Sequence, residues 1–257
     1  MKDWSARQYS KFLDERTLPS IDLVSKISIS NPRKIIDIGC GPGNSTGVLK
    51  ARFSKAQIFG ADLSENMLET AKNNHPDIEF FKFDANSDFP KLDASYDVVF
   101  SNACIQWIKN QENVIKNMFS IVAPGGILAV QVPVNFNEPI HVTLETLGKS
   151  DKWFGKIGIE KIFFNEDDHN YFDIVSSLTN DFRVWETTYC HRVKSHEDII
   201  EWYRGTCLRP YLDCLSEEDG RIFCSELLEL VKKEYPVHKN GEILLKFPRY
   251  FFTAKKS

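Results

Sequence analysis

Short apolar runs alternate with amphipathic segments through the first half of the chain. The runs are rich in Ile, Val and Phe and are followed by Gly, Asp or Asn, which is typical of buried strands that end in turns. Between the runs, apolar residues recur every three or four positions, as they do on one face of a helix. Strands that alternate with helices predict an α/β fold with a mostly parallel sheet and helices on both faces. The strands expected are 34–39, 57–62, 78–83, 96–101 and 127–132.

Helices are expected between these strands. Ser64 is a suitable N-cap for a helix at 65–73, and Asn44 or Ser45 is expected to cap a helix at 46–53. Side-chain oxygens of these residue types accept hydrogen bonds from the first free backbone N–H groups of a helix.

The first thirty residues also have helical spacing. Tyr9, Phe12 and Leu13 form one stretch, and a second stretch follows Pro19.

The alternation loosens in the second half of the chain. Ser195 and Asp198 have the spacing of an acidic capping box, which predicts a helix that opens there. Strands are expected at 183–191 and 243–253. Because helices lie between them, they predict a sheet edge with a helical insertion, or lid, near the C-terminus. The remaining helices are expected at 110–122, 138–148, 169–178 and 216–235.

Composition narrows the function classes. The 257 residues are 42% hydrophobic, which is enough for a full core, and the net charge is −4. A mildly acidic chain has no general attraction for phosphate backbones, so nucleic acid is not expected as a partner. No apolar run approaches the roughly 20 residues of a membrane span, and charges stand where a signal peptide has its apolar core. We therefore expect a soluble cytosolic protein. Its six cysteines form no Cys-x-x-Cys pair, so we expect reduced thiols and no metal site.

A glycine-rich turn follows the first predicted strand. Its sequence, Asp37-Ile-Gly39-Cys-Gly41-Pro42-Gly43, leads into a helix, as a nucleotide-binding turn does. Glycine lets the backbone bend sharply and lets a ligand approach closely. Pro42 removes an N–H group that a phosphate cradle would use, and an acidic residue at position 37 suits a cationic amino-acid group better than a pyrophosphate.

Two further acids end the next two strands. Asp62 lies about twenty residues after the turn, the spacing of an acid that accepts hydrogen bonds from ribose hydroxyls. Asp84, followed by Ala85, is placed to bind an adenine amino group. Carboxyl ends of parallel strands meet at one edge of the sheet, so the acids and the turn are expected to share one crevice.

These residues resemble the class I S-adenosylmethionine-dependent methyltransferases. The resemblance implies a Rossmann-like, seven-stranded sheet whose last strand is antiparallel, and S-adenosylmethionine as the cofactor. It also implies that the turn binds the methionine part of the cofactor, the second-strand acid the ribose, and the third-strand acid the adenine. The implied cofactor-binding residues are Asp37, Gly39, Gly41, Gly43, Asp62, Leu63, Asp84, Ala85 and Asn102.

The segment Ser101 to Trp107 ends the fourth strand, where cofactor and substrate meet in such sheets. Gln106 and Trp107 are candidates to face the transferred methyl group and the acceptor. A core position is the alternative for Trp107.

Beyond this core, the chain resembles the trans-aconitate 2-methyltransferases along nearly its whole length. The motifs that carry this resemblance include Thr187-Thr188-Tyr189, Leu208-Arg209-Pro210 and Phe247-Pro248-Arg249. It implies methyl transfer to a carboxylate of a small di- or tricarboxylic acid. Guanidinium groups grip carboxylates in pairs of hydrogen bonds, so Arg209 and Arg249 are the first candidate anchors. Weaker candidates are Tyr189, His191 and Tyr211, and each of the five has a structural alternative.

The sequence leaves other acceptors and another class of protein open. A fatty or carrier-bound carboxylate, an amine or a phenol is an alternative acceptor, and a SAM-binding protein without transfer activity is an alternative class.

We expect one methyltransferase domain over 1–257, with an N-terminal helical cap at 1–30, a cofactor-binding core at 31–133 and substrate-side helices and final strands at 134–257. Residues 1–16 are expected to form a lid that excludes water from the site, and a helix packed on the outside of the sheet is the alternative.

Overall fold

The computed structural model describes residues 13–93, 95–158, 164 and 166–257. Residues 1–12, which include most of the expected lid, lie outside the described part of the chain. Within it, the chain divides into two compact units. The sheet unit contains Leu13–Pro133, Phe163–Thr187 and Arg249–Ser257, and the helical unit contains Val134–Ile162 and Thr188–Pro248.

The seven described strands form one sheet in the order β3-β2-β1-β4-β5-β7-β6. β1 to β5 are parallel to one another, and β7 is antiparallel to β5. This confirms the expected Rossmann-like sheet and its antiparallel late strand. The strands are β1 (Lys34–Ile38), β2 (Gln57–Asp62), β3 (Glu79–Lys82), β4 (Tyr96–Asn102), β5 (Val122–Pro133), β6 (Phe182–Val193) and β7 (Ile243–Lys255).

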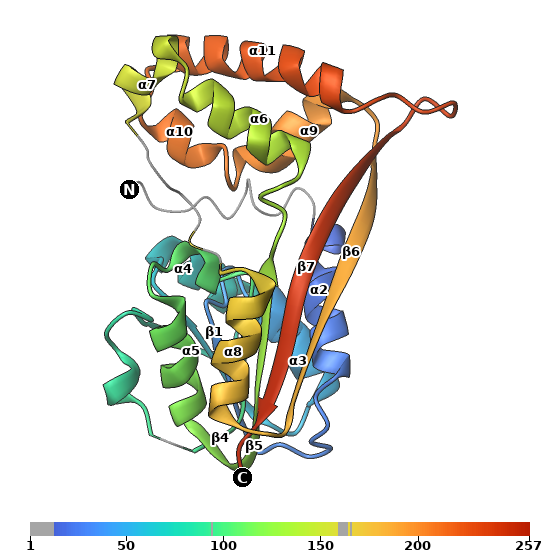
Figure 1. Cartoon of the computed structure of the whole chain (residues 1–257). Coiled ribbons are helices and arrows are strands. Elements are labelled where there is room, and N and C mark those ends of the chain that lie inside the picture. The colour runs from blue at the N-terminus through green and yellow to red at the C-terminus, as the bar shows by residue number, and fades with distance from the viewer. Residues whose placement is uncertain (1–12, 94, 159–163, 165) are drawn as a thin grey trace. The chain divides into compact units, whose positions relative to one another are not determined.

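Helices cover both faces of the sheet in its own unit. Helices α5 and α8 lie over the face nearest the viewer in Figure 1, and α2 and α3 lie on the opposite side. Ile35, Ile36, Val98 and Val99 in the two central strands are fully buried between these layers. The elements are α2 (Leu13–Ser25), α3 (Asn44–Arg52), α4 (Glu65–Asn74), α5 (Gln111–Ser120) and α8 (Asp168–Leu178), with short 3-10 turns η2 (Phe89–Lys91) and η3 (Ile105–Trp107).

Two local predictions about the helices of this unit had different outcomes. Ser64 caps α4, since its side chain accepts a hydrogen bond from the Met67 N–H group, as predicted. The second helical stretch, expected after Pro19, does not begin there, because α2 starts at Leu13 and runs through the proline. Beside the proline, the Ser20 hydroxyl donates to the carbonyl of Thr17, one turn back.

The helical unit has its own aromatic core. Trp153 packs edge-on against Phe223 with ring centroids 5.2 Å apart, and Tyr211 stacks on the same phenylalanine. The capping box predicted from Ser195 and Asp198 is present at the start of α9. The helices of this unit are α6 (Pro139–Gly148), α7 (Asp151–Ile157), α9 (His196–Arg204), α10 (Arg209–Asp213) and α11 (Glu217–Glu234).

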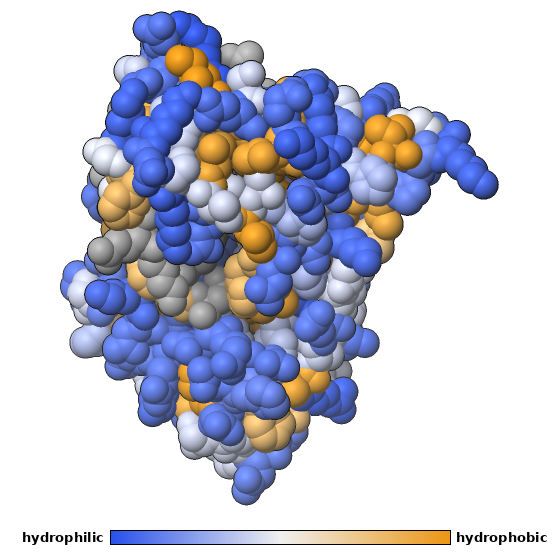
Figure 2. Space-filling model, turned by 45° about the horizontal axis from the view of Figure 1, so that its top comes forward, coloured by the Kyte–Doolittle hydropathy of each residue, from blue (hydrophilic) through white to orange (hydrophobic). Residues whose placement is uncertain are grey.

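The surface of the described residues shows no extended apolar region on the face drawn in Figure 2, where small hydrophobic groups are separated by hydrophilic ones. Among the described helices, none combines the length and apolar composition that a membrane crossing requires.

Candidate functional site

The glycine turn after β1 is fixed to the end of β2. The backbone N–H groups of Gly39 and Cys40 both donate to the carbonyl of Ala61, at 2.7 and 3.1 Å. Gly39, Gly41 and Gly43 have φ angles of 74, 54 and 92°. Residues other than glycine rarely adopt backbone φ angles in this range, so the turn depends on all three residues being glycine.

Two of these glycines have different surroundings. A Cβ atom added to Gly39 would lie 2.2 Å from Cys104 Sγ, so the end of β4 packs directly on the turn. A Cβ atom added to Gly41 would meet nothing within 4 Å. The described residues therefore leave Gly41 open to a ligand while Gly39 is held from behind. Burial, together with the carboxylates of Asp62 and Asp37, raises the pKa of the Cys104 thiol to about 12, so it stays protonated at neutral pH.

Asp37 supports the turn from inside the fold. Its Oδ2 atom accepts hydrogen bonds from the hydroxyls of Ser45 and Thr46, both at 2.7 Å. Burial raises its pKa to about 6, although the two hydroxyls act against the rise. Its Oδ1 atom is buried without a hydrogen-bond partner among the described residues. A buried carboxylate oxygen of this kind suits a cationic group brought by a ligand.

The same contacts correct a prediction about the following helix. Asn44 and Ser45 do not cap α3, because Gly43 occupies the N-cap position and no side chain caps the helix. The Ser45 hydroxyl bonds to Asp37 instead. The hydroxyl that local sequence rules assign to the cap is therefore used to hold the Asp37 side chain.

Asp62 links the turn to the end of β2. Its Oδ2 atom accepts from the Gly41 N–H group at 2.8 Å, and its Oδ1 atom accepts from the Ser64 N–H group at 2.9 Å. Each carboxylate oxygen can accept more than one hydrogen bond, so these contacts orient the group and leave it able to accept from a ligand. The next residue, Leu63, has 57% of its surface exposed.

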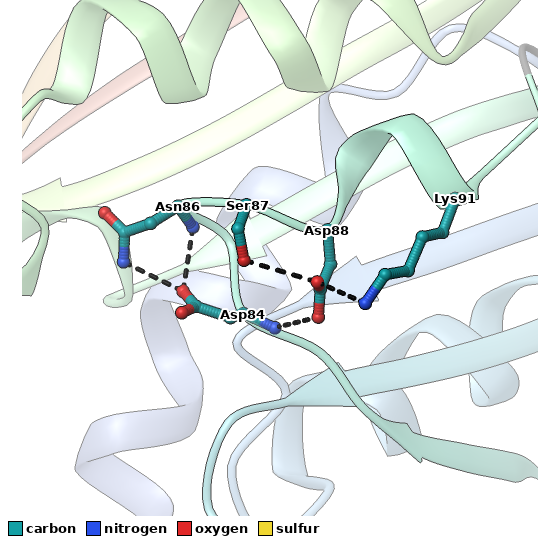
Figure 3. Close-up of polar contacts among 5 residues, drawn as sticks. All are labelled: Asp84, Asn86, Ser87, Asp88 and Lys91. Carbon is teal, nitrogen blue, oxygen red and sulfur yellow. Dashed lines mark hydrogen bonds and ion pairs between the residues drawn. The ribbon is translucent and has the colours of Figure 1, made fainter.

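Asp84 lies in a loop held by its own hydrogen bonds (Figure 3). Its Oδ1 atom accepts from both the backbone and the side-chain nitrogen of Asn86, each at 2.9 Å, and its own N–H group donates to Asp88. That backbone N–H group and Lys91 lower the pKa of Asp88. The network fixes the loop at the carboxyl end of β3, with Ala85 buried behind it.

The end of β4 carries two amide side chains. Asn102 is the last residue of the strand, and Gln106 lies in η3 with its Nε2 atom donating to the carbonyl of Ala103 at 2.7 Å. Asn102 Oδ1 and Gln106 Oε1 are buried and have no hydrogen-bond partner among the described residues. Trp107 is partly exposed, and its role in the site stays a prediction.

All nine predicted cofactor residues therefore lie in the sheet unit, at or just beyond the carboxyl ends of β1 to β4. Contacts join several of them into one cluster: Asp62 bonds to Gly41, and Cys104, two residues after Asn102, packs on Gly39. Phe83, next to Asp84, donates its N–H group to the carbonyl of Asp62.

The two predicted arginine anchors lie in different units. Arg249 is in the sheet unit, in the part of β7 that pairs with Pro133 of β5, and only 7% of its surface is exposed. Arg209 begins α10 in the helical unit, with its Nε atom 3.6 Å from a carboxylate oxygen of Asp213. Their roles in substrate binding stay predictions.

Aromatic packing surrounds the weaker candidates in the helical unit. His191 is buried, with its ring centroid 4.8 Å from that of Trp202 and 6.2 Å from that of Phe247. Tyr189 stacks on His191, and Tyr211 belongs to the Phe223 cluster. These contacts supply a structural reason for each residue that does not depend on a substrate.

One buried polar residue was not predicted as part of the site. Gln131 lies near the carboxyl end of β5, opposite Asn102 of β4. A signal was present in the sequence, since Gln131 is the one polar residue in the run Ile127 to Val132. It was not specific, because an isolated polar residue in a strand also occurs in ordinary structural roles.

Comparison with known sequences links the chain to methyltransferases. A family model described as "Methyltransferase domain" matches residues 35–126, which include the turn, Asp62 and Asp84. A curated sequence named trans-aconitate 2-methyltransferase, from Escherichia coli O157:H7, is 35% identical over 259 aligned positions and covers all of both chains. The similarity thus includes the second half of the chain, beyond the cofactor-binding strands.

Solved structures share the fold at much lower identity. The YcgJ protein of Bacillus subtilis matches 93% of this chain and 98% of its own, with a TM-score of 0.60 and 14% identity. The [4+2]-cyclase SpnF matches 99% of this chain and 86% of its own, with a TM-score of 0.57 and 12% identity. Because a protein named as a cyclase has this fold, the fold alone does not determine the reaction.

Proposed function

Because the chain belongs to the family of trans-aconitate 2-methyltransferases, we propose that it methylates one carboxylate of trans-aconitate, or of a closely similar di- or tricarboxylic acid, to a monomethyl ester. The chain is an S-adenosylmethionine-dependent methyltransferase. The full-length similarity is the observation that carries the choice of substrate, since it includes the second half of the chain, which the general methyltransferase model does not match.

The residues at the carboxyl end of the sheet fit the cofactor. Gly41 is open to an approaching group, and Asp37 offers a buried carboxylate oxygen to an ammonium group. Asp62 is oriented to accept from ribose hydroxyls, and Leu63 exposes an apolar surface suited to a flat base. Asp84 and Ala85 would contact the adenine edge, and Asn102 would accept from the amino-acid part.

The proposed methyl transfer requires the protein mainly to position the cofactor and the acceptor. S-adenosylmethionine supplies a methyl group on a sulfonium sulfur, which keeps the electron pair of the S–C bond while a carboxylate oxygen gains the methyl group. A carboxylic acid has a pKa of about 4, so the acceptor is already ionised at neutral pH and needs no base. Residues around the acceptor therefore act by aligning it and by excluding water.

The acceptor has further carboxylates that need anchors. Arg249 is buried on β7, where a guanidinium group can form paired hydrogen bonds with a carboxylate at low exposure to water. Gln106 and Trp107 lie just beyond β4, next to the strand end that carries Asn102. We assign these three residues, all of the sheet unit, to the acceptor.

A substrate panel with methyl-labelled cofactor tests the proposal. We expect base-labile label, released as methanol, with trans-aconitate and more weakly with other di- and tricarboxylates. Label on an amine or a phenol is stable in base, and label on a fatty acid would partition into organic solvent. Either of those results without any trans-aconitate ester would contradict the choice of acceptor. Tight cofactor binding without transfer to any acceptor would contradict catalysis itself.

A further inference from the structure

Gln131 is a buried amide without an internal explanation. None of its surface is exposed, and neither its Oε1 nor its Nε2 atom has a hydrogen-bond partner among the described residues. Leaving both atoms of an amide unsatisfied in a protein interior is costly, and native folds rarely do so. A ligand that accepts a hydrogen bond from Nε2 would supply one of the two missing partners.

The pairing of the strands gives Gln131 its neighbours. It lies opposite Asn102 on β4 and opposite Phe251 on β7. Two residues further along the same strand pair, Pro133 lies opposite Arg249. Alternate residues of a strand project from the same face, so Asn102, Gln131 and Arg249 share one face of the sheet. The diagonal separation of Gln131 and Arg249 is about 7–8 Å between Cα atoms, within reach of one small acid bound by both.

The cofactor residues project from that same face. Asp37 pairs with Phe100 of β4, and Asn102 is two residues further along that strand. Asp37 also pairs with Gly60 of β2, two residues before Asp62. Gln131 therefore lies between the residues assigned to the cofactor on one side and Arg249 on the other.

We propose that Gln131 is the residue that orients the reacting carboxylate of the acceptor, its Nε2 atom donating to the oxygen that is not methylated while Arg249 binds a second carboxylate. This assignment rests on the proposed function. An amide suits the reacting group better than a guanidinium does. A guanidinium would occupy both oxygens and stabilise their charge, whereas a neutral N–H donor fixes one oxygen and leaves the other available.

Gln131→Met is the main test, because methionine has nearly the shape of glutamine and no hydrogen-bonding amide. A lost hydrogen bond to a charged group predicts a 10- to 100-fold fall in kcat/KM for the acid. We expect calorimetric affinity for S-adenosylhomocysteine to change less than about threefold. The melting temperature should hold or rise, because an unsatisfied buried amide has been replaced by an apolar group. A merely structural amide predicts the opposite, a lower melting temperature with kcat/KM little changed, and that result would overturn the proposal.

Gln131→Glu sharpens the test, since it places a negative charge beside the acceptor carboxylate. We expect a larger loss of kcat/KM than in Gln131→Met, and no gain in affinity for S-adenosylmethionine. Tighter cofactor binding in the glutamate variant would show that position 131 faces the cationic cofactor, and it would overturn the assignment.

Thr253→Val is the matched control for both variants. Thr253 is a buried polar residue opposite Ala129, on the same face of the same strand pair but further from the strand end. Its kinetic constants should equal those of the wild type.

The failure of the proposed function is a separate result. If the wild type methylates another carboxylic acid and not trans-aconitate, the choice of acid fails, and the Gln131 variants are measured with the acid that is methylated. If the wild type esterifies an acid and both Gln131 variants keep full kcat/KM for it, the inference about Gln131 fails alone.

Discussion

Among the described residues, the carboxyl end of the sheet holds more buried polar atoms without hydrogen-bond partners than the helical unit does. In the helical unit, charged side chains pair at the surface, as Lys156 does with Asp219 and Arg192 with Glu242, and the interior is largely aromatic. At the end of the sheet, Asp37, Asn102 and Gln131 are buried with oxygen atoms that have no hydrogen-bond partner among the described residues.

This difference separates structural polar groups from functional ones. Surface ion pairs contribute little to stability and leave nothing for a ligand to complete. Buried polar atoms without partners reduce stability, so their concentration at one end of one sheet indicates where a ligand belongs. The variants below test that contrast, from the largest expected effect to the smallest.

Asp62→Ala should have the largest effect. The change removes an acceptor for two ribose hydroxyls and also the support of the Gly41 N–H group, so cofactor affinity should fall by about 1,000-fold. Calorimetric titration with S-adenosylmethionine measures it. Glu65→Ala is the control, because Glu65 is exposed and pairs only with Lys82 among the ion pairs described. Equal affinities of Asp62→Ala and wild type would remove Asp62 from the site.

The cost of burying Asp37 should appear in the pH dependence of stability. Its folded pKa of about 6 exceeds the ordinary value of 3.8, so between these pH values the folded protein holds a proton that the unfolded chain has released. Stability from this group is therefore complete below pH 3.8 and is lost as pH rises through 6, by about 3 kcal/mol in total.

Asp37→Asn isolates this contribution, because asparagine does not titrate and can still accept from Ser45 and Thr46. Urea unfolding of both proteins without cofactor, at several pH values from 4 to 7, should show the variant gaining on the wild type as pH rises. A difference in unfolding free energy that is independent of pH would mean that Asp37 does not carry the raised pKa. Cofactor affinity at neutral pH should be weaker in the variant, because the ammonium group loses its charged partner.

The arginine pair gives the smallest effects and compares the two units directly. Arg249→Ala should raise KM for the acid by about 30-fold through loss of a buried charge-assisted contact. Arg209→Ala should raise it less, about threefold, because its Nε atom already faces Asp213. Affinity for S-adenosylmethionine should change little in both. Arg192→Ala, on an exposed ion pair, should change neither constant. A parallel loss of acid and cofactor binding would point to a structural role for either arginine.

The sequence alone was sufficient for the order of the elements and for placing the glycine turn and the two acids at one end of the sheet. Hydrophobic periodicity located every strand of the sheet to within a few residues, except that β5 begins five residues before the apolar run that predicted it. Two short helices, α7 and α10, were not predicted, since one or two turns carry too little periodicity to be recognised. The glycine turn, Asp62 and Asp84 were identifiable because strand ends are local features, and parallel strands bring such ends to one edge.

Tertiary structure decided which polar groups have partners. Nothing near Ser45 in the sequence shows that its hydroxyl bonds to Asp37 rather than capping α3, and nothing near Gln131 shows that Asn102 lies opposite it. The first outcome depends on how the turn folds back on β1, and the second on the register of β4 against β5, and local propensity encodes neither. The sequence determined which groups are present at the end of the sheet. Packing determined which of them have hydrogen-bond partners among the described residues and which do not.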